Sequence, residues 1–225
     1  MKKYSAYILF LTFIMLLITI ININNVIAKQ NTNDIVIYID AGHGGFDGGA
    51  TSNDKKIIEK DITLNASMIL KNYLEKLNYK VYLTRDDDKA LAKSKKDDIY
   101  KRVELINKKE TDLYISIHAN SYPVPSVKGA QTFYSTTFEN NKLLAKKIMK
   151  YLQIIDSTNK REAKEIKGKY LLDHTSVTGC LVELGFLTNQ IDLNRLTNIE
   201  QLKETMFMVY LGIIEYLEEI NLWAK

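Results

Sequence analysis

IVIYIDAGHGGFDGG, residues 35–49, is the stretch that decides the fold expected for this chain. Branched and aromatic apolar residues alternate up to Asp40, which is typical of a buried strand. Five glycines then fall within residues 42–49, so the backbone of this loop can take positive φ and let another group approach closely. A strand that ends in such a loop is where α/β proteins build their sites, and this loop carries one histidine, His43.

The composition is that of an ordinary globular protein. With 225 residues, 46% of them apolar and 26% charged, the chain is long enough for one sizeable core, and we expect a single domain behind an N-terminal appendage. The net charge is +4, and without Lys2 and Lys3 it falls to +2, with 29 basic and 27 acidic residues. So small an excess argues against a nucleic-acid-binding surface.

Residues 1–28 have the features of a signal peptide. Lys2 and Lys3 precede an apolar run, and a short polar stretch then leads to Val-Ile-Ala, which predicts cleavage after Ala28. The alternative is an uncleaved membrane anchor, because the apolar run is only somewhat short for a spanning helix. In either case we expect residues 35–220 to form an exported domain, secreted or anchored to the membrane.

The chain has one cysteine, Cys180, and therefore no intramolecular disulfide. An exported domain of this kind must be held together by its core. Cys180 lies between Gly179 and the apolar residues of LVEL, and we expect it to be a small buried hydrophobic residue rather than a nucleophile.

Helical and strand patterns alternate beyond the glycine loop. Residues 85–96 are charge-rich, and we expect an exposed loop or frayed helix whose charges are solvated. Residues 156–168 are polar and basic, which predicts a surface excursion. The alternation favours an α/β domain with a twisted, largely parallel sheet flanked by helices. The predicted helices cover residues 59–77, 99–106, 143–155 and 202–217, and the predicted strands cover residues 35–39, 80–84, 113–119, 129–135 and 180–184.

Parallel strands end at one edge of a sheet, and this edge would collect His43, His118 and Glu183. Glu59 opens the first helix and would lie near the same edge. Two imidazoles and one carboxylate, with a fourth position left open, are the ligands of catalytic zinc at about 2.0–2.2 Å. His43, Glu59 and His118 could supply them, and the ion would lower the pKa of a bound water towards ~7. Glu183, off the metal, would then move a proton from that water to a leaving amine.

Each of these residues also has a purely structural explanation. His43 has little packing to offer within AGHGG, but His118 could be a core histidine with its hydrogen bonds satisfied. Glu59 could be a favourable carboxylate in the first turn of a helix, and Glu183 is costly to bury unless it is paired or bound to a metal. No HExxH motif is present, so spacing alone is a weak indication of zinc.

Other chemistries fit less well. Ser116 and His118 share one face of a strand, but no orienting acid completes a triad with them. The glycine loop lacks the GK[ST] ending of a phosphate-binding loop. His174, in LLDHTSVTG, is expected to be a surface or hydrogen-bonded loop residue.

Four motifs together resemble a known family. They are DAGHGG at residues 40–45, EKD at 59–61, SIHAN at 116–120 and LVELGFLTN at 181–189. In this order they resemble the zinc-dependent N-acetylmuramoyl-L-alanine amidases of bacterial cell-wall turnover. Ala41 and Thr178 stand where that family usually has proline, and neither change removes a ligand.

The resemblance implies a peptidoglycan substrate and a zinc cofactor. It implies His43, Glu59 and His118 as the zinc (Zn2+) ligands and Glu183 as the catalytic carboxylate. The implied reaction is hydrolysis of the amide between the lactyl group of N-acetylmuramic acid and L-alanine of the stem peptide. A signal segment followed by a bare catalytic domain is most similar to the spore-cortex, germination-specific branch, which places the protein in the cell wall or the forespore intermembrane space.

Several alternatives stay open at this point. The enzyme could be a vegetative or phage-derived wall amidase, or another zinc hydrolase such as a peptidase or sugar deacetylase. The domain could also bind peptidoglycan without catalysis. A regulatory protein partner is a further expectation; the basic residues 160–169 could face one, although we expect a solvated loop there.

Overall fold

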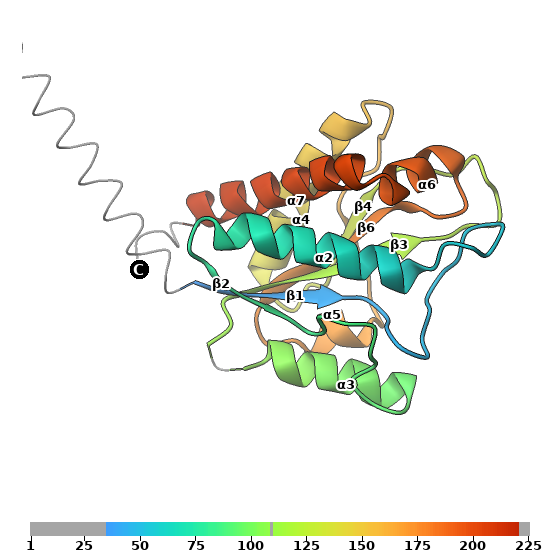
Figure 1. Ribbon diagram of the computed structural model, residues 1–225. Helices are drawn as coiled ribbons and strands as arrows, with labels where there is room; N and C mark the ends of the chain where they lie inside the picture. The colour runs from blue at the N-terminus through green and yellow to red at the C-terminus, as the bar shows by residue number, and fades with distance from the viewer. Residues whose placement is uncertain (1–34, 109, 221–225) are drawn as a thin grey trace, which may run out of the picture.

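The structure is a computed structural model that describes residues 35–108 and 110–220. Its centre is a six-stranded sheet in the order β2-β1-β3-β6-β4-β5 (Figure 1). The pairs β1–β2, β1–β3, β3–β6 and β4–β5 are parallel, and β4–β6 is antiparallel. The strands are β1 (Val36–Ala41), β2 (Lys80–Leu83), β3 (Leu113–Asn120), β4 (Gln131–Tyr134), β5 (Lys164–Glu165) and β6 (Thr178–Phe186). The predicted α/β class with a largely parallel sheet is confirmed.

Helices cover both faces of the sheet (Figure 1). On one face, α2, α4 and α7 pack over the strands, and on the other lie α3 and α5. The helices are α2 (Glu59–Glu75), α3 (Lys95–Ile106), α4 (Glu139–Ile155), α5 (Tyr170–His174), α6 (Gln190–Thr197) and α7 (Ile199–Glu219). Among the described residues no helix is long and apolar enough to cross a membrane.

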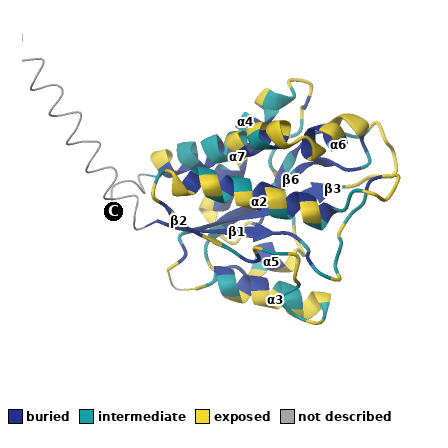
Figure 2. Cartoon of the chain, viewed as in Figure 1, coloured by how far each residue is buried: buried dark blue, intermediate teal, exposed yellow. Residues whose placement is uncertain are grey.

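The side chains of β1 alternate between the two faces of the sheet, and both faces are buried. Ile37 and Ile39 are fully buried in the larger core, towards α2 and α7, while Tyr38 belongs to the smaller core with α3 and α5. Both faces of the strand are therefore covered, as Figure 2 shows by its uniformly buried colour. Each fully buried isoleucine contributes about 1.5–3 kcal/mol of hydrophobic stabilisation.

The glycine loop leads from β1 into α2 and fixes where that helix begins. The N–H of Glu59 donates to the carbonyl of Ala50 at 2.8 Å, and the N–H of Lys60 donates to that of Gly48 at 3.1 Å. Two N–H groups at the start of the helix thus have partners in the loop rather than in a capping side chain. The loop and the first turn of α2 form one hydrogen-bonded unit at the carboxyl end of β1.

Some expectations need correction. Residues 156–168 are more than a surface excursion, because Lys164–Glu165 form β5 and extend the sheet beside β4. Residues 85–96 are mostly loop, but α3 already begins at Lys95, where the side chain of Ser94 accepts a hydrogen bond from the N–H of Asp97. The predicted signal peptide, residues 1–28, lies outside the described residues.

Candidate metal centre and catalytic carboxylate

Three of the predicted site residues meet at the carboxyl edge of the sheet. His43 comes from the loop after β1, Glu59 from the first position of α2, and His118 from the end of β3. His43, Glu59 and His118 each offer one ligand atom, and these atoms all lie within 4.8 Å of one another. The two imidazole rings stand 5.0 Å apart, nearly perpendicular to each other.

Glu59 stands between the two histidines and is almost fully buried. Its Oε1 lies 2.9 Å from Nδ1 of His118, and its Oε2 lies 3.1 Å from Nε2 of His43. The N–H groups of Ala119 and Ala50 also donate to this carboxylate, at 3.1 and 2.7 Å. Burial alone would raise the pKa of Glu59, but the hydrogen bonds from both histidines hold this pKa well below its usual range. The group is therefore a carboxylate, which is the form that binds metal ions.

Two glycines make room for these side chains. A Cβ on Gly42 would lie 2.4 Å from Cε1 of His118, and a Cβ on Gly49 would lie 2.4 Å from Oε2 of Glu59. Gly49 also has φ +71°, a conformation that favours glycine. His43 itself has φ 61°, so the surrounding structure must hold its backbone in place.

Two buried arginines, which the sequence analysis did not single out, bind the backbone of the histidine loop. Arg85 donates to the carbonyl of Gly42 at 3.0 Å and to that of Ala41 at 3.0 Å. Arg102 donates to the carbonyls of Ala41, at 2.6 Å, and His43. Three consecutive carbonyls are thus bound by guanidinium groups. The expectation that charges in 85–96 are only solvated is wrong for Arg85, which is 4% exposed.

Asp40 supplies the negative charge that accompanies these arginines. Its carboxylate accepts hydrogen bonds from Arg102 at 2.7 Å, from Thr84 at 2.8 Å and from Ser116 at 2.6 Å. Burial would raise the pKa of Asp40, but the charges of Arg102 and His118 and the hydrogen bonds from Ser116 and Arg102 hold this pKa below the usual value. The hydroxyl of Ser116 therefore donates its hydrogen bond to Asp40, and it forms none with His118.

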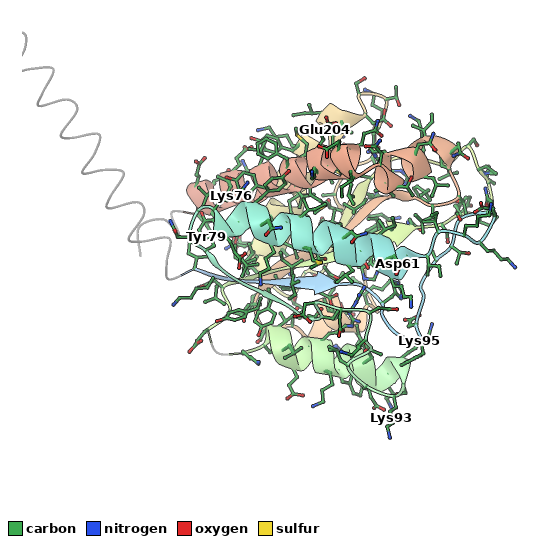
Figure 3. All side chains as sticks on the ribbon, viewed as in Figure 1. Asp61, Lys76, Tyr79, Lys93, Lys95 and Glu204 are labelled. Carbon is green, nitrogen blue, oxygen red and sulfur yellow. The ribbon has the colours of Figure 1, made fainter. Side chains whose placement is uncertain are left out.

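A second carboxylate orients His43 from outside the group. Oδ2 of Asp47 lies 2.9 Å from Nδ1 of His43, and Oδ1 of Asp47 lies 2.7 Å from Nζ of Lys95. Lys95 stands where α3 begins, beside the histidine loop (Figure 3). Burial lowers the pKa of His43, but the hydrogen bonds and charges of Glu59 and Asp47 outweigh it and raise this pKa above its ordinary value. A carboxylate on the second ring nitrogen is the usual partner of a metal-binding histidine.

Glu183 lies on the neighbouring strand, in register with His118. Its Oε2 is buried and has no hydrogen-bond partner among the described residues. Burial raises the pKa of Glu183 to about 7, with the charge of His118 opposing this and the charge of Glu59 adding to it. A carboxyl with such a pKa can both take up and release a proton near neutral pH.

The four residues line one cavity of about 410 Å³. His43, Glu59 and His118 supply two nitrogen ligands and one anionic oxygen, a donor set that fits zinc and leaves room for a further ligand. Glu183 faces the same cavity without belonging to the three-residue group. The arrangement therefore places a group that can hold a metal ion beside a separate carboxyl that can exchange a proton.

The remaining residues singled out from the sequence lie apart from this chemistry. His174 ends α5, is exposed, and stacks on Tyr170 with ring centroids 3.9 Å apart. Cys180 is fully buried, and burial raises the pKa of its thiol, so it behaves as a small hydrophobic residue.

Comparison with known proteins connects this geometry to an activity. The model of the N-acetylmuramoyl-L-alanine amidase family matches residues 37–215. The germination-specific N-acetylmuramoyl-L-alanine amidase of Bacillus subtilis (strain 168) is 37% identical over 192 residues, a match that covers 82% of this chain and 80% of that protein.

Solved structures show the same fold. The CwlD amidase of Clostridioides difficile, determined in complex with the GerS lipoprotein, aligns with a TM-score of 0.78 and 34% identity, covering 82% of this chain and 99% of that chain. The amidase AmiC2 of Nostoc punctiforme aligns with a TM-score of 0.72 and 28% identity, and the alignment covers 82% of this chain and 98% of that chain. A family match that spans most of the described fold, and contains both the His–Glu–His group and Glu183, means that this chain belongs to the N-acetylmuramoyl-L-alanine amidases, hydrolases of peptidoglycan.

Proposed function

We propose that this amidase depends on zinc, held by His43, Glu59 and His118, and that Glu183 is its catalytic carboxylate. The single observation that carries the proposal is that three ligand atoms within 4.8 Å of one another share a cavity with a buried carboxyl. Bound zinc would supply Lewis-acid chemistry, which acidifies water and polarises the scissile carbonyl.

The protein's own contribution to the reaction is proton transfer. Glu183 takes the proton of the attacking water on Oε2, the oxygen that has no hydrogen-bond partner among the described residues. It then delivers this proton to the nitrogen of L-alanine as the amide to the lactyl group breaks. Burial favours this role, because the raised pKa of Glu183 makes the protonated state accessible at neutral pH.

The substitution Glu183→Gln tests this assignment, since it keeps the shape and removes the proton carrier. We expect hydrolysis of purified muropeptides to fall by at least about 10²-fold, the scale of one general acid–base group, with one zinc per chain retained. Glu104→Gln, an exposed change on α3, is the matched control. Full activity of Glu183→Gln would reject the assignment.

Mass spectrometry of the digested products separates the other hypotheses. An amidase leaves intact glycan and frees peptides that start at L-alanine. A peptidase would cut within the stem peptide, and a deacetylase would release acetate and leave the amide intact. A catalytically idle binding module would retain muropeptides and release nothing.

We also propose that the enzyme acts on spore cortex, where it removes stem peptides from muramic acid before the muramic lactam forms. The similarity to the germination-specific amidase of Bacillus subtilis supports this role. Wall from a deletion strain, with vegetative and spore material analysed separately, tests it. Loss of lactam in spores with unchanged vegetative wall is expected, and a defect confined to vegetative wall would contradict the proposal.

Export and regulation form the last part of the proposal. We propose that residues 1–28 direct export, with cleavage after Ala28, and that the domain works in the cell wall or the forespore intermembrane space. Intact Met1 on protein recovered from the cell surface would show an uncleaved anchor instead. The complex of the Clostridioides difficile amidase with GerS supports a regulatory partner. Full zinc loading and activity of the isolated chain would speak against one.

A further inference from the structure

The cavity beside Glu183 contains a lysine that the proton-transfer steps do not use. Lys169 lines this cavity, at the residue that precedes α5. Among the described residues it is the only lysine or arginine that does so. Glu59 and Glu183 line the same cavity, so an ammonium group shares this space with the proposed metal ligand and the proposed catalytic carboxylate.

Most other cations of the basic segment 160–169 have partners elsewhere. Lys160 donates to the carbonyl of Ser157 at 2.9 Å, and Lys167 lies 3.4 Å from Glu165. Arg161 donates to Gln131 at 3.0 Å and to the carbonyl of Lys128 at 3.1 Å. Lys169, by contrast, is exposed and forms no ion pair with any described residue. Its charge is therefore available to a molecule that enters the cavity.

A stem peptide can offer a suitable anion. The residue that follows L-alanine can carry a free carboxylate or the corresponding amide. A carboxylate on the residue after L-alanine lies at most about 7 Å along the chain from the scissile nitrogen, since each residue spans at most ~3.6 Å. When that nitrogen stands beside Glu183, such a carboxylate lies within the same cavity as Lys169 or at its rim.

We infer that Lys169 binds a free carboxylate of the stem peptide next to L-alanine, and that it gives the enzyme a preference for acidic over amidated stem peptides. The inference rests on the proposed function, because it places the scissile amide beside Glu183.

The test compares two synthetic muropeptides that differ only in whether this carboxyl is free or amidated. The zinc-loaded wild-type chain should hydrolyse the acidic form with a kcat/KM about fivefold higher, the ratio expected for one partly exposed ion pair. In Lys169→Met this preference should vanish through a higher KM for the acidic form, with kcat unchanged and the amidated form unaffected. High salt should reduce the wild-type preference, because it screens an exposed pair.

Two further variants separate charge from structure. Lys169→Arg should keep the preference, and Lys167→Met, the same change at a lysine that does not line the cavity, should also keep it. An equal loss of kcat with both substrates in Lys169→Met, or a wild-type enzyme that does not distinguish them, would overturn the inference and leave the amidase assignment standing. Failure to cleave either substrate would instead reject the proposed function itself.

Discussion

Arg102 donates a hydrogen bond from its guanidinium group to the backbone carbonyl of His43, 59 positions away in the sequence. The same side chain pairs with Asp40 at 2.7 Å and with Asp98 at 2.6 Å, and it is 2% exposed. One buried cation thus connects β1, α3 and the loop that presents a proposed ligand. The position of the imidazole depends on a residue that does not itself enter the cavity.

Replacing Arg102 by leucine should destabilise the fold strongly. The change leaves Asp40 buried without its cation, which costs about 3–5 kcal/mol in the free energy of unfolding. Urea denaturation of the metal-free protein measures this loss. Lys101→Leu, the exposed neighbour on α3, should change stability by less than about 0.5 kcal/mol. Equal effects of the two substitutions would show that the buried pair contributes nothing.

Asp47→Asn should weaken zinc binding without removing a ligand. The carboxylate that holds Nδ1 of His43 is lost, and changes of such partners reduce metal affinity by about 10–100-fold. Competition with a chromophoric chelator gives the dissociation constant. Asp86→Asn, an exposed aspartate in the loop after β2, is the matched control and should bind zinc as the wild type does. An unchanged affinity in Asp47→Asn would mean that the loop alone orients the ring.

Zinc affinity should fall as the pH is lowered. Because Glu59 and Asp47 raise the pKa of His43 above 6.5, the metal-free protein holds a proton on this ring in mildly acidic solution. Zinc must displace that proton, so the apparent affinity should drop by about tenfold for each pH unit below the pKa of His43. Calorimetry in two buffers of different ionisation enthalpy measures the proton released. In Asp47→Asn the pKa of His43 should be lower, and the fall in affinity should begin at a lower pH.

Gly212→Ala should destabilise the protein, although alanine is the better helix former by about 1 kcal/mol. A Cβ on Gly212 of α7 would lie 2.5 Å from Cα of Ile148 in α4, so the two helices would have to move apart. Overpacking of this kind costs about 1–3 kcal/mol. Thermal unfolding measures it, and Glu204→Ala, at an exposed position of the same helix (Figure 3), is the control. A rise in melting temperature for Gly212→Ala would show that the helices separate easily.

Much of this architecture follows from local pattern. The alternation of helices and strands predicts the parallel sheet, and the strand-end rule brings His43, His118 and Glu183 to one edge. The first turn of the helix after the loop adds Glu59. These residues could be found because each interrupts an apolar or glycine-rich context where a polar side chain has no simple packing role.

The arginines could not be found in the same way. Arg85 and Arg102 lie among many surface charges, and nothing in their immediate neighbours distinguishes a guanidinium that points inward. Their burial depends on Asp40 and on backbone carbonyls that are distant in sequence. Local pattern predicts the strand at residues 129–135, but its antiparallel pairing with β6 and the two-residue β5 depend on tertiary contacts, which local periodicity does not show.

Chelation of the zinc-loaded enzyme should abolish activity and leave the fold intact. The histidine loop is bound by Arg85 and Arg102, and Glu59 accepts hydrogen bonds from two backbone N–H groups, so these contacts do not depend on an ion. Treatment with EDTA should therefore leave the far-ultraviolet circular dichroism unchanged. The melting temperature should fall only because the folded state loses the free energy of zinc binding. Unfolding on chelation would show that the ion is needed for folding.

The room that Gly42 and Gly49 leave for the side chains of His118 and Glu59 limits how the histidine loop can vary. A larger residue at either position would push a proposed ligand aside, although neither glycine offers a side chain of its own. The sequence of this loop is therefore constrained at two positions that carry no chemistry themselves.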